Sequence, residues 1–220
     1  MSEPGGRPAR AVLFDFGGVI TASPFDAFRS YEAENQLPEG LIRTLNATNP
    51  DTNAWARLER SEVDLDGFAE LFEAEAQAHG HTVDGKAVLG LLSGEVRPMM
   101  VTALRRIKAA GLRLAVLTNN FVSVPAGEAT KREIDAAEAM ALFDTVIESS
   151  KAGVRKPDPA AYQLVLDELL VNPDEIVYLD DLGINLKPAR ALGMRTIKVT
   201  DPEVALAELS AVLGIELVDP

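Results

Sequence analysis

Three carboxylates of the sequence stand at the ends of apolar runs. Asp15 follows the run 11–14, and Asp180 and Asp181 follow the run 176–179. A continuous apolar run that ends on polar residues is typical of a buried strand in a parallel sheet. Because ligands bind beyond the carboxyl ends of such strands, we expect these carboxylates to meet at one edge of the sheet. Adjacent carboxylates repel one another unless a cation neutralises them, so the Asp180–Asp181 pair favours a Mg²⁺ site built from oxygen ligands.

Groups that can bind an anion are expected at the same edge. Thr118 and Asn119 follow the apolar run 115–117, and a hydroxyl beside a backbone N–H forms a cradle for a phosphate oxygen. Lys156 lies in the segment 155–159, whose prolines stiffen the chain. A lysine held near the carboxylates can neutralise an anionic nucleophile together with its substrate. The ordinary alternatives are a helix cap for Thr118 and a solvated loop position for Lys156.

Glycines and an asparagine flank the acidic residues. Gly17 and Gly18 follow Asp15 and permit a sharp turn with a close approach of the backbone. Asn185 is expected to cap the helix that follows the acidic pair, with Pro188 in the first turn of that helix. A hydrogen bond from Asn185 into the site is an alternative to the capping role.

The composition is that of a globular chain without affinity for polyanions. It has 220 residues, 47% hydrophobic and 25% charged, with a formal net charge of -13. That acidity argues against nucleic acid as a partner, and an anionic substrate would need a cation supplied locally. The absence of cysteine excludes disulfides and thiolate catalysis. The sequence has neither a membrane-spanning apolar stretch nor an apolar secretory signal, so we expect a cytoplasmic protein; it does not predict the oligomeric state.

Strand and helix patterns alternate through the second half of the chain. This alternation predicts an α/β fold, a Rossmann-like parallel sheet with helices on both faces. Residues 21–95 read as helical throughout, so we expect a small helical cap inserted after the first strand, with residues 1–20 and 96–220 as the core. An all-helical extension of the core is the alternative. The expected strands cover residues 11–18, 112–117, 145–148, 176–179 and 195–199, and the expected helices cover residues 24–34, 98–110, 128–140, 159–170, 185–192 and 202–213.

Together these motifs resemble the haloacid dehalogenase-like hydrolase superfamily, most of whose members are phosphatases. The most specific stretch is residues 178–194, which begins Tyr-Leu-Asp-Asp-Leu-Gly, and residues 117–119 and 155–159 support it. The resemblance covers essentially the whole chain. It extends to the amino-terminal phosphatase-type domain of soluble epoxide hydrolase and to the related domain of acyl-CoA dehydrogenase fusions.

The resemblance implies a role for each candidate residue. The implied set is Asp15 as the nucleophile, Lys156 as the charge-neutralising lysine, Thr118 and Asn119 as phosphate binders, Asp15, the Gly17 carbonyl and Asp181 as Mg²⁺ ligands, and Asp180 and Asn185 in support behind them. The implied reaction is Mg²⁺-dependent hydrolysis of a small-molecule phosphate ester through an aspartyl-phosphate.

The chain departs from the family pattern at Gly17. Phosphatases of this family usually carry a second Asp at that position as general acid, so protonation of the leaving group comes into question. One alternative is a metal-independent 2-haloacid-type dehalogenase, in which Asp15 attacks carbon; the Asp180–Asp181 pair counts against it. Another is a catalytically weak phosphate-binding or regulatory module. Epoxide hydrolysis itself is not expected, because that activity belongs to a separate domain for which this sequence has no room.

Overall fold

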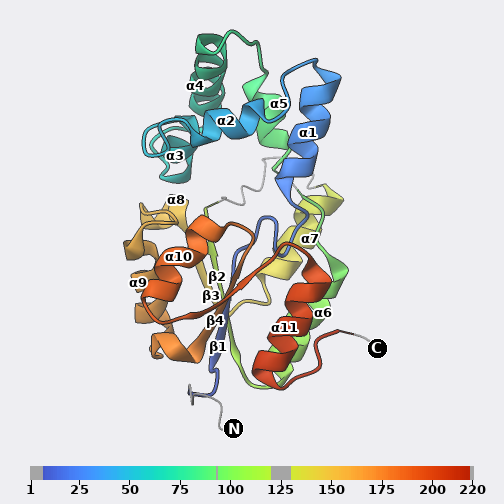
Figure 1. Ribbon diagram of the computed structural model, residues 1–220, viewed down its shortest axis with the longest axis vertical. Coiled ribbons are helices and arrows are strands. Elements are labelled where there is room, and N and C mark those ends of the chain that lie inside the picture. The colour runs from blue at the N-terminus through green and yellow to red at the C-terminus, as the bar shows by residue number, and fades with distance from the viewer. Residues whose placement is uncertain (1–6, 93, 120–129, 219–220) are drawn as a thin grey trace.

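A five-stranded parallel sheet, in the order β3-β2-β1-β4-β5, forms the centre of the protein. The computed structural model describes residues 7–92, 94–119 and 130–218 (Figure 1). Neighbouring strands are parallel and in register, with Ala11 of β1 opposite Arg113 of β2 and Ile176 of β4. The predicted α/β fold class is therefore confirmed. The strands are β1 (Ala11–Phe14), β2 (Arg113–Thr118), β3 (Thr145–Glu148), β4 (Ile176–Asp180) and β5 (Arg195–Lys198).

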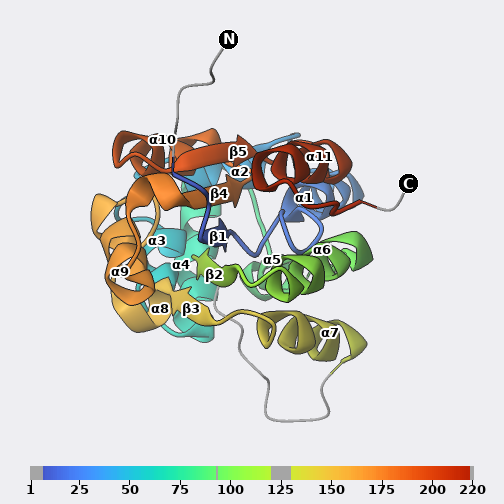
Figure 2. The same cartoon turned by 90° about the horizontal axis from the view of Figure 1, so that it is seen from below.

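Helices cover both faces of the sheet (Figure 2). Successive side chains of β1 point to opposite faces, so Val12 and Phe14 join one hydrophobic cluster whereas Ala11 and Leu13 join the other. The helices α6 (Pro98–Ala109), α7 (Lys131–Met140) and α11 (Pro202–Leu213) pack on the first face, and α9 (Pro159–Leu169) and α10 (Gly183–Ala191) pack on the second. Short helices α8 (Ser149–Ala152) and η1 (Pro173–Glu175) lie in the connections before and after α9.

Some predicted boundaries are corrected by the structure. The first strand ends at Phe14 rather than at residue 18, because a turn begins directly after Asp15. Helix α10 begins at Gly183 with Leu182 as its N-cap residue, so the prediction that Asn185 caps this helix is wrong. Pro188 lies inside α10 and not in its first turn. The predicted start of helix α7, at residue 128, falls outside the described residues.

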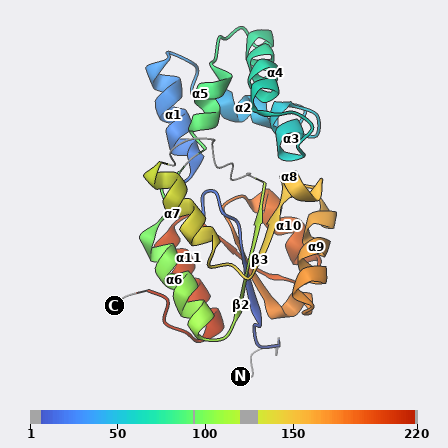
Figure 3. The ribbon, with the colours of Figure 1, turned by 180° about the vertical axis from the view of Figure 1, so that it is seen from behind.

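Between β1 and α6 the described chain forms a helical block that packs around its own aromatic core. Trp55 stands edge-on to Phe68, with ring centroids 4.6 Å apart, and Phe68 stacks on Phe72. Figure 3 shows this block beyond the carboxyl ends of the strands. Its helices are α1 (Pro24–Glu34), α2 (Leu41–Ala47), α3 (Ala54–Glu59), α4 (Leu65–Ala78) and α5 (Gly85–Gly90).

The two segments that connect this block to the sheet run side by side. Thr21 and Val96 form an antiparallel bridge, and the Ala22 N–H donates to the Glu95 carbonyl over 2.8 Å. The paired connections support a cap that begins and ends at these residues, and we retain residues 21–95 as the proposed cap. Within the described residues, no helix has both the length and the apolar character that a membrane crossing requires.

The pairing of the two connections leads to a stability prediction at Gly94. A Cβ on Gly94 would lie 2.5 Å from the Ala22 carbonyl oxygen, whereas a Cβ on Gly90 in α5 meets no atom within 4 Å. We expect Gly94→Ala to lower the free energy of unfolding by about 1–3 kcal/mol through overpacking. The matched change Gly90→Ala should be neutral or stabilise by about 0.5–1 kcal/mol. Urea denaturation of both variants checks this, and an unaffected Gly94→Ala protein would contradict the close contact.

Candidate active site

The three predicted carboxylates do meet at the carboxyl edge of the sheet. Asp15 follows β1, Asp180 is the last residue of β4, and the Asp15 N–H donates to the Leu179 carbonyl over 2.8 Å. One carboxylate oxygen from each of Asp15, Asp180 and Asp181 lies within 4.8 Å of the others. This distance suits carboxylates that share one cation.

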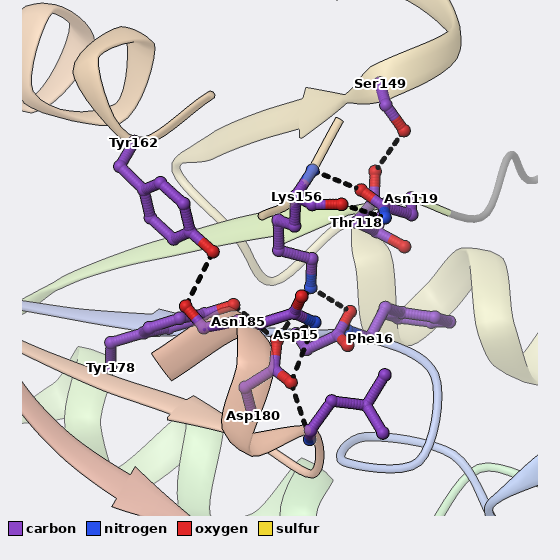
Figure 4. A network of polar contacts seen from close by, with 11 residues as sticks. Asp15, Phe16, Thr118, Asn119, Ser149, Lys156, Tyr162, Tyr178, Asp180 and Asn185 are labelled. Carbon is purple, nitrogen blue, oxygen red and sulfur yellow. Dashed lines mark hydrogen bonds and ion pairs between the residues drawn. The ribbon is translucent and has the colours of Figure 1, made fainter. Parts of the chain in front are cut away.

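Lys156 is the cation that the protein itself supplies to this cluster. Its ammonium Nζ lies 2.9 Å from Asp15 Oδ1 and 2.9 Å from Asp180 Oδ2, and its side chain is 1% exposed (Figure 4). Burial acts to lower the pKa of Lys156, but Asp15 and Asp180 outweigh burial and the pKa is raised. The lysine is therefore a permanent positive charge between the two carboxylates.

One carboxylate oxygen of Asp15, Oδ1, is bound by neighbouring groups of the protein. Oδ1 accepts from the Phe16 N–H over 2.6 Å as well as from Lys156. Burial raises the pKa of Asp15 to about 8, against the lowering effect of Lys156. Burial disfavours the ionised form, so a further cation beside Asp15 would favour the carboxylate that a nucleophile requires.

Asp180 and Asp181 differ in how the protein binds them. Asp180 is fully buried and accepts from Lys156, from the Tyr178 hydroxyl, from the Leu182 N–H at 2.8 Å and from Asn185 Nδ2 at 3.1 Å. Among the described side chains, none donates a hydrogen bond to Asp181. Burial raises the pKa of Asp181 to about 6, and Asp180 adds to the effect. The Asp180 carboxyl group is thus occupied by hydrogen bonds from the protein, whereas the Asp181 carboxyl group retains the capacity to bind a cation.

The turn after Asp15 lets Asp181 approach. Gly18 has a φ of 77°, and a Cβ at this position would lie 2.3 Å from Asp181 Oδ2. Only glycine combines that left-handed backbone with that space. Gly17 lines the cavity described below and is not among the described glycines with positive φ. The cluster of carboxylate oxygens is a donor set that fits Mg²⁺.

The predicted phosphate binders lie at the end of β2. Thr118 is buried as the last residue of that strand, and its carbonyl accepts from Ser149 Oγ over 3.1 Å. Asn119 clamps the backbone of Lys156: Oδ1 accepts from the Lys156 N–H at 2.8 Å, and Nδ2 donates to the Lys156 carbonyl at 2.9 Å. The positioning of Lys156 by the Asn119 side chain is an additional role that the sequence analysis missed.

Asn185 and two tyrosines form a buried layer beneath the carboxylates. Asn185 binds Asp180 with its side chain, which is the alternative role considered for it, and its carbonyl accepts from the Tyr162 hydroxyl over 2.6 Å. Tyr178 is fully buried and donates to Asp180. The sequence analysis gave Tyr178 no role, although alternation along a strand places residues 178 and 180 on the same face.

A cavity of about 910 Å³ opens between the helical block and the sheet edge. Asp15, Lys156 and Asp181 line it from the core. Phe25 and Phe28 line it from α1, so these aromatic residues face the cavity as well as the core of the cap. Such a concave site, lined by aromatic residues together with a few charged groups, is the usual form of a small-molecule site.

The cap reaches the catalytic edge through Arg155. Its guanidinium forms an ion pair with Glu59 of α3, and Nη1 donates to the Pro50 carbonyl over 2.7 Å. Ser61 Oγ adds a second contact, to the Ser150 carbonyl at 2.9 Å. From the sequence, the position of Arg155 next to Lys156 places this arginine near the site. No local pattern indicates that Glu59 pairs with Arg155.

Comparisons with known proteins agree with this geometry. Residues 9–193 match the family described as haloacid dehalogenase-like hydrolase. The chain is 40% identical over 221 residues to acyl-CoA dehydrogenase family member 10 of Mus musculus, covering 98% of this chain but 20% of that protein. It is 31% identical over 219 residues to bifunctional epoxide hydrolase 2 of Sus scrofa, covering 94% of this chain and 39% of that protein.

Other relatives match over most of their length. The protein named phosphatase MT3486 of Mycobacterium tuberculosis is 35% identical over 199 residues, with 86% of each chain covered. Among solved structures, one described as a dehalogenase has a TM-score of 0.64 at 21% identity, covering 94% of this chain and 98% of that chain. At that identity the likeness supports the fold alone.

The buried layer gives a prediction with an internal control. Tyr178→Phe removes a donor to Asp180, the carboxyl group paired with Lys156, whereas Tyr162→Phe removes a donor to a neutral carbonyl. Since hydrogen bonds to charged groups contribute about 1.5–3 kcal/mol and neutral ones about 1 kcal/mol, Tyr178→Phe should be the more destabilising change. Chemical denaturation of both variants measures this; an equal or reversed order would show that Tyr178 does not support Asp180.

The raised pKa of Asp181 gives a pH prediction for the chelator-treated protein. A carboxyl whose folded pKa exceeds its unfolded value favours folding below the unfolded value, about 4, and that contribution is lost as the pH rises through about 6. Asp181→Asn should therefore become more stable than wild type as the pH rises from about 4 to about 7, by at most about 3 kcal/mol.

Adding Mg²⁺ should reverse that order. Wild type should be stabilised by the ion through mass action, and the Asp181→Asn variant should gain much less. Melting temperatures recorded with chelator and with Mg²⁺ provide the measurement. If both proteins gain equally, Asp181 does not bind the ion.

Proposed function

Because the chain belongs to the haloacid dehalogenase-like hydrolase family, we propose that it is a Mg²⁺-dependent phosphatase acting on a small phosphate ester through an aspartyl-phosphate on Asp15. The observation that carries the proposal is the carboxylate cluster: Asp15 and Asp181 converge within 4.8 Å beside the Lys156 ammonium. The carboxylates can bind a cation, and that cation together with the buried lysine can neutralise a negatively charged substrate.

In the proposed reaction Asp15 attacks the phosphorus atom while the bond from phosphorus to the ester oxygen breaks. The ester oxygen leaves with the electrons of that bond and takes up a proton to become the alcohol, and phosphorus is then bonded to Asp15. Water then attacks phosphorus, the bond to Asp15 breaks, and inorganic phosphate is released with the carboxylate restored. A covalent intermediate thus divides one difficult step into two easier steps.

The surrounding residues position and neutralise the reacting groups. Lys156 holds Asp15 in place and offsets the charge of the transferred phosphoryl group, and Asn119 fixes the loop that carries this lysine. Thr118 and the Asn119 N–H are placed to bind phosphate oxygens. When bound by Asp15, the Gly17 carbonyl and Asp181, Mg²⁺ supplies the remaining positive charge and orients the phosphate.

The cavity sets limits on the ester. Phe25, Phe28 and Trp55 provide an aromatic wall opposite the charged edge. An ester with an apolar body beyond its phosphate would bury that body against this wall while its phosphate lay beside Lys156. The relative named as a phosphatase, which matches over 86% of its length, supports the same class of reaction.

A metal-independent dehalogenase is the second candidate, because Gly17 stands where a phosphatase acid is expected. The acidic cluster disfavours it. Without a metal ion, three carboxylates would lie within 4.8 Å of one another beside the single Lys156 ammonium, whereas Mg²⁺ would add a second positive charge there.

The proposal predicts hydrolysis of p-nitrophenyl phosphate that requires Mg²⁺ and is abolished by chelator. Asp15→Asn should lower kcat by at least about 10³-fold, because it deletes the nucleophile of the covalent route. Thermal denaturation of the variant controls for folding. Full activity in chelator, or halide release from a 2-haloacid without metal, would instead support the dehalogenase.

A further inference from the structure

The reaction lacks a proton donor at the position where the family usually carries one. Gly17 has no side chain, yet an alkyl leaving oxygen needs a proton as its bond to phosphorus breaks. General acid catalysis contributes about 10²–10⁴-fold to such a step. A donor must therefore reach the cavity from elsewhere in the chain.

The described carboxylates that line the cavity can be compared one by one. Asp15 and Asp181 belong to the cation site. Asp51 is exposed, and Asp158 is exposed and caps helix α9 by accepting from the Ala160 N–H. Glu59, the last residue of α3, is the one left: its side chain is 15% exposed and faces the cavity from the cap.

We propose that Glu59 is the general acid, donating a proton from the cap to the leaving oxygen of the ester. This inference rests on the proposed phosphatase function. The proton of the Glu59 carboxyl passes to the ester oxygen as its bond to phosphorus breaks, and the alcohol leaves neutral. In the second step the Glu59 carboxylate takes a proton from the attacking water, which restores the carboxyl as phosphate is released.

The contacts of Glu59 suit this role. Its ion pair with Arg155 is made through Oε2, which is buried, so that pair does not engage Oε1. Arg155 also donates to the Pro50 carbonyl over 2.7 Å, and it therefore keeps an acceptor when Glu59 is protonated. Since Arg155 directly precedes Lys156, the segment that carries the catalytic lysine also positions the cap acid.

The electrostatic surroundings leave Glu59 able to hold a proton near neutral pH. Burial raises the pKa of Glu59 to about 7, although Arg155, Lys156 and Arg60 each act to lower it. A general acid is most effective when its pKa lies close to the working pH. An incoming dianionic phosphate would raise the pKa further, because it adds like charge to the cavity.

The test compares two esters in wild type and Glu59→Gln at saturating Mg²⁺. A phenol with strongly electron-withdrawing groups leaves without a proton, whereas a simple alkanol does not. We expect Glu59→Gln to lower kcat/KM for the alkyl phosphate by about 10²-fold or more while p-nitrophenyl phosphate changes by less than about 3-fold. The pH profile for the alkyl ester should lose its descending limb, which in wild type lies near the pKa of Glu59.

Two further variants separate acid catalysis from cap closure. Glu62→Gln is the matched control. Like Glu59, Glu62 forms an ion pair with an arginine, here Arg60, but its side chain is 48% exposed and does not line the cavity. The kcat/KM of both esters should therefore be unchanged in this variant. Arg155→Met breaks the cap contact and removes a charge that lowers the pKa of Glu59. It should shift the descending limb to higher pH.

The outcomes distinguish this inference from the function on which it rests. If wild type hydrolyses neither ester with Mg²⁺, the phosphatase proposal fails. If wild type hydrolyses both, and Glu59→Gln lowers both equally or leaves the alkyl ester unaffected, Glu59 is not the acid and the inference is overturned. An equal loss would identify the residue as part of the cap contact alone.

Discussion

The buried ammonium of Lys156 is the interaction on which the site depends. Desolvating a lysine and two carboxylates costs several kcal/mol per ion, which the protein offsets only by placing Nζ 2.9 Å from both Asp15 and Asp180. Removing Lys156 would leave two buried carboxyl groups without the cation that pairs with both of them. The fold meets this requirement by ending two neighbouring strands on acids and by clamping the lysine backbone with Asn119.

The same arrangement divides the acidic residues by task. Asp180 is saturated by donors from Tyr178, Leu182, Asn185 and Lys156, so it fixes geometry and has little capacity left for a ligand. Asp181 is held close by the left-handed turn at Gly18 but receives no hydrogen bond from the other described side chains. Asp181 is therefore the acidic residue left able to bind a cation, at the edge of the hydrogen-bond network around Asp180. The cap joins this network through Arg155, the neighbour of the lysine.

The sequence allowed much of this to be predicted, for reasons that can be traced to particular residues. Apolar runs that lead into Asp15, Thr118 and Asp180 predict the parallel strands and the edge at which these residues meet. The capping role expected for Asn185 was wrong because α10 begins earlier, at Gly183, and the alternative role, a hydrogen bond into the site, is the one found, with Asp180 as the partner. The ion pair of Glu59 with Arg155 was not predictable either, because it joins segments far apart in the chain that meet only in the folded structure.

The central claim is that Asp15 attacks phosphorus and not carbon, and isotope transfer from water tests it most directly. The enzyme turns over a phosphate ester many times in ¹⁸O-labelled water. Mass spectrometry of the peptide that contains Asp15 and of the released phosphate then locates the oxygen that water delivers. Our account predicts label in the released phosphate and none in Asp15, because water attacks the phosphorus of the intermediate. Label accumulating in the Asp15 carboxylate would show that water attacks that carboxyl carbon, as in an alkyl-ester intermediate, and would contradict the account.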